Sequence, residues 1–191
     1  MEHYYQTIGE NWFTYPKIYQ GAVKYFGSGS AFVEVGSWRG RSSVYMGVEI
    51  VNSGKEICFI CVDTWDGSEE NQGHELLDND GLFLEFLKNI EPVEDVVGFF
   101  RGTSLEASEQ FEDGSLDFVF IDASHDYDNV KADINAWYPK VREGGVIAGH
   151  DYPDWSGVKR AVDEFFGKKI VAKYKSWVHQ KGRNDFYRFI R

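Results

Sequence analysis

Acidic and imidazole side chains follow two apolar segments of the chain, at the positions where these segments end. Asp122 and His125 follow one run, and His150 and Asp151 follow another. Asp122, His150 and Asp151 would repel or desolvate one another unless a positive group lay between them, and either a divalent metal or an ammonium group would serve. His125 stands close to Asp122 and is a candidate general base. The sequence therefore predicts a functional site at these two segment ends.

A glycine turn precedes these residues. Gly36 and Gly40 occur within residues 34–42, directly after a short apolar run. Gly36 permits a tight turn close to a ligand, and the helix that follows would offer free N–H groups to a carboxylate. The G-x-x-x-G spacing differs from the G-x-G-x-x-G of dinucleotide folds, and an ordinary turn between a strand and a helix is the alternative.

Two further polar positions follow apolar runs. Asp63 lies 27 positions after Gly36. A carboxylate there can accept hydrogen bonds from two ribose hydroxyls, although a helix N-cap is the alternative. Residues 101–104 could border an adenine ring, or Thr103 and Ser104 could cap a helix.

Apolar runs and helical stripes alternate along the chain. We expect parallel strands at 31–35, 57–62, 96–100, 116–121 and 145–149, each followed by a helix. Residues 170–178 and 186–190, separated by a turn at 180–184, should pair as an antiparallel hairpin. The predicted fold class is α/β: a Rossmann-like, seven-stranded, mostly parallel sheet with a C-terminal antiparallel β-hairpin and helices on both faces. Ligands of such sheets bind beyond the carboxyl ends of the strands, where the polar residues above would lie.

Two segments are expected to cover that site. Residues 1–30 are rich in aromatic side chains and should form helices folded over one edge of the sheet, covering the site, with the main domain at 31–191. The long polar connection 66–81 predicts a mobile flap hinged at glycines 67, 73 and 81, with a disordered surface loop as the alternative. Cys58 and Cys61 lie three positions apart on a predicted strand, so we expect two core cysteines that point to opposite faces.

Composition limits the classes of partner. The chain has 191 residues, of which 42% are apolar, which suits one folded domain and excludes a disordered chain. A net charge of −11 repels phosphate backbones and anionic lipid, so we expect neither a nucleic-acid partner nor a membrane surface. With no apolar run of membrane-spanning length and no signal-peptide pattern, we expect a soluble, cytoplasmic protein, for which a homo-oligomer stays open.

Four stretches resemble the class I S-adenosylmethionine (SAM)-dependent methyltransferases, and among these the small methyltransferase 24 group related to the macrocin O-methyltransferases. The stretches are residues 32–40, 62–65, 120–127 and 144–151, within a resemblance that covers roughly 30–191. It implies SAM as cofactor, O-methylation of a small hydroxylated molecule, and assistance from either a divalent metal (Mg²⁺, Mn²⁺ or Fe²⁺) or a His/Asp base. His150 departs from those relatives, which usually have another carboxylate there, and imidazole suits Mn²⁺ or Fe²⁺ better than Mg²⁺.

The resemblance also implies roles for individual residues. The cofactor-binding residues would be Glu34, Gly36, Ser37, Trp38, Gly40, Ser42, Asp63, Thr64, Trp65, Gly102, Thr103, Ser104, Asp122 and Ala123. Among them, Glu34 and Gly36 would cradle the methionine part and Asp63 would hold the ribose. The catalytic residues would be Asp122, His125 and Asp151, and the metal ligands Asp122, His150 and Asp151.

Two other functions remain as alternatives. A nucleotide- or NAD-binding oxidoreductase would share the fold, but the second fingerprint glycine is missing and Trp38 lies in its region. A non-catalytic protein could also keep the fold as a scaffold for partner binding.

Overall fold

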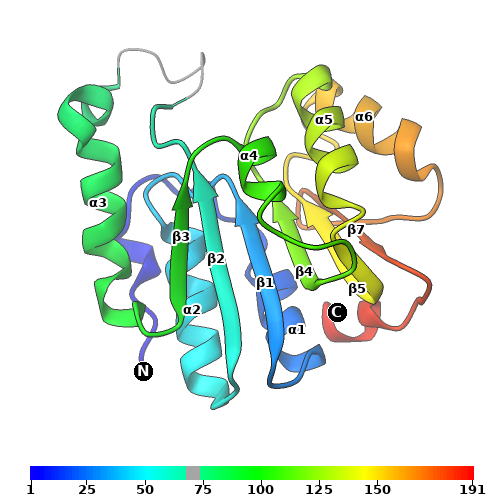
Figure 1. Cartoon of the computed structure of the whole chain (residues 1–191), viewed down its shortest axis with the longest axis horizontal. Coiled ribbons are helices and arrows are strands. Elements are labelled where there is room, and N and C mark those ends of the chain that lie inside the picture. The colour runs from blue at the N-terminus through cyan, green and yellow to red at the C-terminus, as the bar shows by residue number, and fades with distance from the viewer. Residues whose placement is uncertain (68–73) are drawn as a thin grey trace.

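In the part of the chain that the structure describes, seven strands form one sheet with helices on both faces (Figure 1), and this arrangement confirms the predicted fold class. The computed structural model describes residues 1–67 and 74–191. The strand order is β3-β2-β1-β4-β5-β7-β6. The first five of these strands run parallel to one another. Strand β7 pairs antiparallel with β5, and β6 pairs antiparallel with β7.

The strands are β1 (Ser30–Val35), β2 (Ile57–Asp63), β3 (Val97–Arg101), β4 (Leu116–Ile121), β5 (Val141–Gly149), β6 (Val171–Lys173) and β7 (Ser176–Gln180). The helices are α1 (Pro16–Tyr25), α2 (Arg41–Ser53), α3 (Gly81–Ile90), α4 (Ser104–Ser108), α5 (Tyr127–Trp137) and α6 (Ser156–Phe166).

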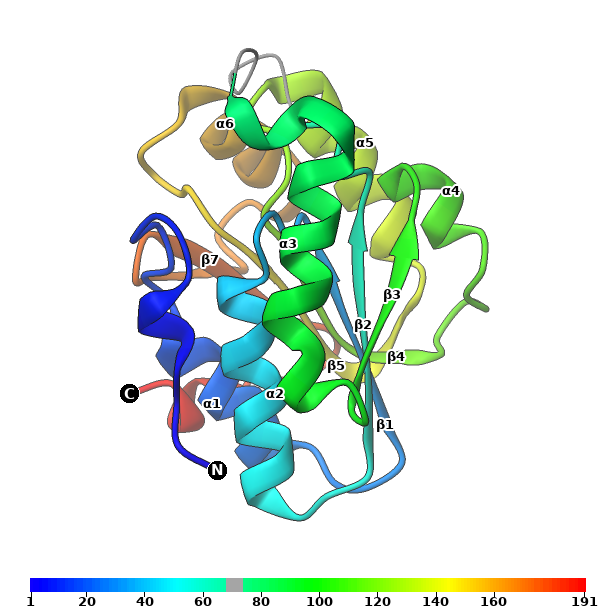
Figure 2. The ribbon, with the colours of Figure 1, turned by 90° about the vertical axis from the view of Figure 1, so that its left-hand side faces the viewer.

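Both faces of the central strands are buried, because helices pack on each side. Along β4, Phe118 and Phe120 point into the cluster beneath α1, α2 and α3, whereas Val119 and Ile121 point into the cluster beneath α4, α5 and α6. Figures 1 and 2 show these two helix layers on opposite sides of the sheet. The near-continuous apolar runs seen in the sequence are what such doubly covered parallel strands require.

The N-terminal segment covers a face of the sheet rather than an edge. Helix α1 packs beside α2, on the face of the sheet that α2 and α3 cover (Figure 2). Its buried stripe includes Ile18, Tyr19, Ala22 and Val23, which belongs to the same core as Phe118 of β4. The predicted position of these helices, over one edge of the sheet, is therefore wrong. An apolar stripe this wide can be buried only against a face of the sheet.

The C-terminal hairpin forms at a different place from the one predicted. Tyr174 and Lys175 both have positive φ (56° and 57°), so a two-residue turn joins β6 to β7 inside the stretch expected to be one strand. Phe186–Phe189 form a 3₁₀ helix instead of a strand. The side-chain oxygen of Gln180 accepts hydrogen bonds from the backbone N–H groups of Asp185 and Phe186, and the Phe186 side chain is buried beside α1. These contacts turn the chain away from the sheet.

Three smaller expectations have separate outcomes. Cys61 is buried and Cys58 is exposed, so the thiols do point to opposite faces, but Cys58 is not a core residue. Cys58 is exposed because the short helix α4 covers only the carboxyl-end part of its face of the sheet (Figure 1), and the start of β2 is left uncovered there. Within the predicted flap 66–81, residues 68–73 lie outside the described residues, and the 3₁₀ segment Glu75–Asp80 packs against α3. Among the described residues, no helix has the length and apolar character needed to cross a membrane.

Candidate active site

A cavity of about 750 Å³ opens at the carboxyl ends of the parallel strands. Residues that follow β1 to β5 line it, as does the N-terminal segment 8–15. The predicted site residues that line the cavity are Gly36, Ser37, Trp38, Ser42, Asp63, Thr64, Gly102, Ser104, Asp122, Ala123, His125, His150 and Asp151. The strand ends therefore gather most of the predicted set in one place.

The turn after β1 passes very close to the end of β4. Gly36 has φ +87°, and a Cβ atom on it would lie 2.0 Å from the carbonyl oxygen of Asp122. The Gly36 N–H donates to the Val62 carbonyl oxygen (2.8 Å), and the Asp122 N–H donates to the Val35 carbonyl oxygen (2.7 Å). Only glycine fits this position, because both its φ and its distance to the neighbouring backbone exclude a side chain.

Asp63 holds the loop that follows this turn. Its Oδ2 accepts hydrogen bonds from the backbone N–H groups of Ser37 (2.8 Å) and Trp38 (2.9 Å), and its Oδ1 accepts one from the Trp65 N–H (2.8 Å). Burial raises the pKa of Asp63, although these N–H groups oppose the rise. Three of roughly four acceptor positions of the carboxylate are thus used, which leaves room for about one ribose hydroxyl.

Glu34 lies under the cavity rather than along it. Its side chain is fully buried and accepts hydrogen bonds from Tyr19 Oη (2.6 Å), Ser37 Oγ (2.8 Å) and Ser43 Oγ. Burial raises the pKa of Glu34, and the three hydroxyl donors counteract part of that rise. The residue ties α1, β1 and α2 together beneath the glycine turn, and it does not line the cavity as its predicted contact with the methionine part requires.

Three other predicted cofactor residues also lie away from the cavity. Trp65 is 2% exposed and packs between the rings of Phe83 and Phe86. Thr103 is the N-cap of α4 in a capping box with Glu106, which is the alternative that the sequence left open. Gly40 is the N-cap of α2 with φ +81°, and a Cβ atom there would lie 3.0 Å from the Phe86 ring.

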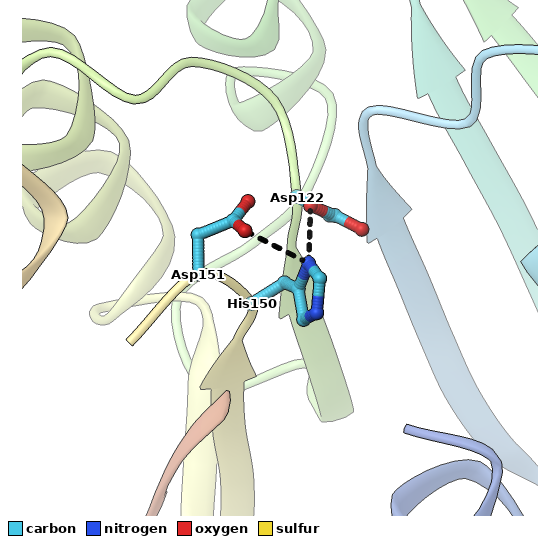
Figure 3. Close-up of side chains that lie close together, drawn as sticks. All are labelled: Asp122, His150 and Asp151. Atoms are coloured by element: carbon cyan, nitrogen blue, oxygen red, sulfur yellow. Dashed lines mark ion pairs between the residues drawn. The ribbon is translucent and has the colours of Figure 1, made fainter. Parts of the chain in front are cut away.

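Asp122, His150 and Asp151 converge at the tips of β4 and β5 (Figure 3). The Nδ1 atom of His150 lies 3.5 Å from Asp122 Oδ1 and 3.3 Å from Asp151 Oδ1. One ligand atom from each of the three residues lies within 4.8 Å of the other two. Oxygen and imidazole donors at this spacing fit a divalent cation such as Mn²⁺ or Fe²⁺.

The charges in this cluster shift two pKa values. Burial lowers the pKa of His150, but the hydrogen bonds and charges of Asp122 and Asp151 outweigh it and raise the pKa to about 10. Burial would raise the pKa of Asp151, but hydrogen bonds with His125 and His150 hold it well below its usual range. The pKa of His150 rises because the two carboxylates stabilise the charged imidazolium, and the pKa of Asp151 falls because the two imidazoles stabilise the charged carboxylate.

His125 lies on the far side of this cluster and also lines the cavity. Its Nε2 atom is 2.9 Å from Asp151 Oδ2, and its ring stacks on Trp155 with a centroid distance of 4.2 Å. A histidine held by a carboxylate in this way is suited to accept a proton, since the carboxylate stabilises the imidazolium.

Two residues that contact the cluster were not predicted from the sequence. Tyr15 Oη donates a hydrogen bond to Asp122 Oδ2 (2.6 Å), and Thr14 Oγ1 lies 2.9 Å from His150 Nε2. Burial, with the charges of Asp122 and Glu34, raises the pKa of Tyr15 well above its usual value, so the phenol keeps its proton. These pairs join residues more than 100 positions apart, and no local spacing could have pointed to them.

Comparisons with known proteins find one related sequence and several similar folds. An uncharacterised protein of Sinorhizobium fredii, y4gI, is 32% identical over 100 residues, which are 49% of this chain and 10% of that protein. The O-methyltransferase NovP is similar in structure, with a TM-score of 0.67, 19% identity, and coverage of 88% of this chain and 79% of its own. The O-methyltransferase of Bacillus cereus, solved in complex with S-adenosylhomocysteine (SAH), has a TM-score of 0.61, 20% identity, and coverage of 88% and 80%.

The family follows from a sequence match that spans the site. The curated relative is about ten times longer than the matched segment, and the solved structures are similar in fold. The model of the methyltransferase domain family matches residues 33–152, from the glycine turn to the cluster at the end of β5. Since this match covers more than half of the chain, the chain belongs to that methyltransferase domain family.

Proposed function

We propose that this chain is a SAM-dependent methyltransferase that methylates a hydroxyl oxygen of a small molecule, assisted by a divalent metal. The observation that carries the proposal is one continuous cavity with Asp63 and the glycine turn on one side and Asp122, His150 and Asp151 on the other. Its volume, about 750 Å³, lies in the upper part of the ~300–1,000 Å³ range of ligand pockets. The cavity therefore has space for a cofactor and an acceptor side by side.

The cofactor half would bind through backbone and carboxylate groups. Asp63 would accept a hydrogen bond from a ribose hydroxyl through the remaining acceptor position of its carboxylate. The turn at Gly36 would let the methionine part approach the backbone closely. Bound there, SAM supplies a methyl group on a positively charged sulfur.

The acceptor half would orient a hydroxyl and remove its proton. An acceptor oxygen attacks the methyl carbon in line as the carbon–sulfur bond breaks, and its proton passes to His125. Asp151 stabilises the imidazolium that forms, because its Oδ2 lies 2.9 Å from His125 Nε2. Holding the two reactants in this geometry can supply part of the ~7–11 kcal/mol available from orientation.

Asp122, His150 and Asp151 would hold the metal. It would supply positive charge beside the acceptor oxygen and lower the pKa of the hydroxyl. A rival role exists for Asp122, which could instead hold the ammonium group of the cofactor.

An SAH-release assay with small phenols and sugar diols tests this proposal, run with Mn²⁺, with Mg²⁺ and after prolonged chelation. We expect turnover that chelation abolishes and Mn²⁺ restores. Turnover that survives chelation, with no metal found by elemental analysis, would assign Asp122 to the ammonium group. SAH binding without turnover on any acceptor would instead favour the non-catalytic scaffold.

The oxidoreductase alternative is disfavoured by the glycine loop. Trp38 takes the place where a dinucleotide fingerprint needs its second glycine, and its backbone N–H is already bonded to Asp63. A pyrophosphate could therefore not approach the backbone as it does in dinucleotide folds.

A further inference from the structure

The carboxylate–imidazole cluster consists of Asp122, His150 and Asp151. In each of these residues one polar side-chain atom faces the cluster, and the second polar atom contacts a residue outside it. Tyr15 donates to Asp122 Oδ2, while Asp122 Oδ1 faces the cluster. His125 binds Asp151 Oδ2, while Asp151 Oδ1 faces the cluster. Figure 3 shows the third case, in which Nδ1 of His150 points at both carboxylates and the other ring nitrogen points away.

The hydrogen bonds of Thr14 determine which nitrogen of His150 carries a proton in the neutral ring. The Thr14 hydroxyl has one hydrogen, which it donates to the carbonyl oxygen of Tyr174 (3.1 Å). A carbonyl oxygen can only accept, so toward His150 Nε2, at 2.9 Å, the Thr14 oxygen must itself accept. In the neutral ring that a metal ligand requires, Nε2 therefore carries the hydrogen, and the lone pair of Nδ1 lies on the side of Asp122 and Asp151.

A rigid scaffold presents Thr14 and Tyr15. Pro16 is the first residue of α1, and the buried Tyr15 ring stacks on Phe120 of β4 with a centroid distance of 4.2 Å. One turn further along α1, Tyr19 donates to the buried Glu34. Helix α1 is thus fixed to the strand ends at two points, so residues 14 and 15 have little freedom relative to the cluster.

We propose that Thr14 and Tyr15 are the positioning residues of the metal site, and that they make Asp122 Oδ1 and His150 Nδ1 the ligand atoms. This inference rests on the proposed function, and it adds that the N-terminal segment forms part of the metal site as well as lining the cavity. Outer partners of this kind fix the tautomer and orientation of metal-ligating histidines and carboxylates, and losing one typically weakens metal affinity about 10–100-fold.

Mn²⁺ binding to the full-length chain tests the inference without any need for activity. The dissociation constant would be measured by titration calorimetry, and by electron paramagnetic resonance of free Mn²⁺, for wild type, Thr14→Val, Thr14→Ser and Tyr15→Phe. We expect Thr14→Val and Tyr15→Phe each to raise the constant about 10–100-fold. Thr14→Ser, which keeps the hydroxyl, should stay close to wild type.

Two matched controls remove similar hydrogen bonds away from the site. Thr7→Val loses a hydroxyl that donates to the backbone carbonyl of Tyr4, in the same N-terminal segment. Tyr25→Phe loses a phenol that donates to a carboxylate, that of Asp185, at the other end of α1. Both should bind Mn²⁺ like wild type. SAH binding and thermal unfolding, measured on the same samples, report whether each variant is folded.

The outcomes separate the inference from the function on which it rests. Wild-type affinity for Mn²⁺ in folded Thr14→Val and Tyr15→Phe would overturn the inference, as would an equal loss in Thr14→Ser. If the wild type binds SAH but no Mn²⁺, and metal analysis finds none, the metal site and this inference are both wrong while cofactor binding stands. If the wild type binds neither, the proposed function fails as well.

Discussion

The close approach of the glycine turn to β4 makes Gly36→Ala a sharp test of how the site is built. Gly29 provides the matched control, since its φ of +85° is almost the same as the +87° of Gly36 and nothing lies within 4 Å of a Cβ atom placed on it. Both substitutions incur the left-handed strain of a non-glycine residue, roughly 1–2 kcal/mol. Only Gly36→Ala adds a collision with neighbouring backbone.

The size of that collision follows from the geometry. The new Cβ would lie 2.0 Å from the Asp122 carbonyl oxygen and 2.8 Å from the Cα of Ala123, whereas real Cβ contacts stay above 3.0 Å. Relief requires the turn and the end of β4 to separate, which strains the hydrogen bonds Gly36 N–H to Val62 O and Asp122 N–H to Val35 O. At about 0.5–1.5 kcal/mol each, their loss brings the total cost of Gly36→Ala to roughly 2–5 kcal/mol.

Urea unfolding followed by circular dichroism measures the difference between the two variants. We expect Gly36→Ala to be less stable than Gly29→Ala by about 1–3 kcal/mol, and to bind SAH more weakly because Asp122 has moved. A Gly36→Ala chain that does not fold, beside a folded Gly29→Ala, would agree in direction. Equal stabilities, with wild-type SAH affinity in both, would refute the packing argument.

Three further predictions concern charged groups. Asp63→Ala should weaken SAH binding by ~1.5–3 kcal/mol in calorimetry, whereas Asp66→Ala, which removes a carboxylate that does not line the cavity, should not. Burial lowers the pKa of His150, but its two carboxylate partners raise it to about 10. The stability that His150 adds to the metal-free chain is therefore complete below the unfolded pKa of ~6.5 and is lost as pH rises toward 10. In urea unfolding, the difference in stability between wild type and His150→Asn should shrink over that pH range. Burial raises the pKa of Asp133 to about 6, so stability falls as pH rises from the unfolded pKa of ~4 to about 6. Asp133→Asn should therefore stabilise the chain at pH 7.5 by about 1–3 kcal/mol, with no gain near pH 4.

Much of the fold could be predicted because parallel strands buried on both faces leave a clear pattern. The run 116–121 is β4 residue for residue, and the positions directly after the strands led to Asp63, Asp122, His150 and Asp151. Their meeting at one edge follows from strand order alone, since the carboxyl ends of parallel strands share an edge.

The rest depended on contacts between distant parts of the chain. Nothing near Thr14 or Tyr15 in the sequence marks them as neighbours of β4 and β5, and only the packing of α1 on the sheet brings them there. Glu34 lies within β1, one residue before the strand ends, and Tyr19, Ser37 and Ser43 enclose it beneath the cavity. The hairpin lies at a different place from the predicted one because its turn is formed by Tyr174 and Lys175. These are two non-glycine residues at positive φ, and their residue types do not indicate a turn.

Calorimetric titration of the purified chain with SAM, SAH and NAD⁺ tests the central claim most directly. We predict that SAM and SAH each bind at one site per chain, that they compete with one another, and that NAD⁺ produces no binding heat. Binding of NAD⁺ without binding of SAM or SAH would contradict the assignment of this cavity to a methyltransferase cofactor.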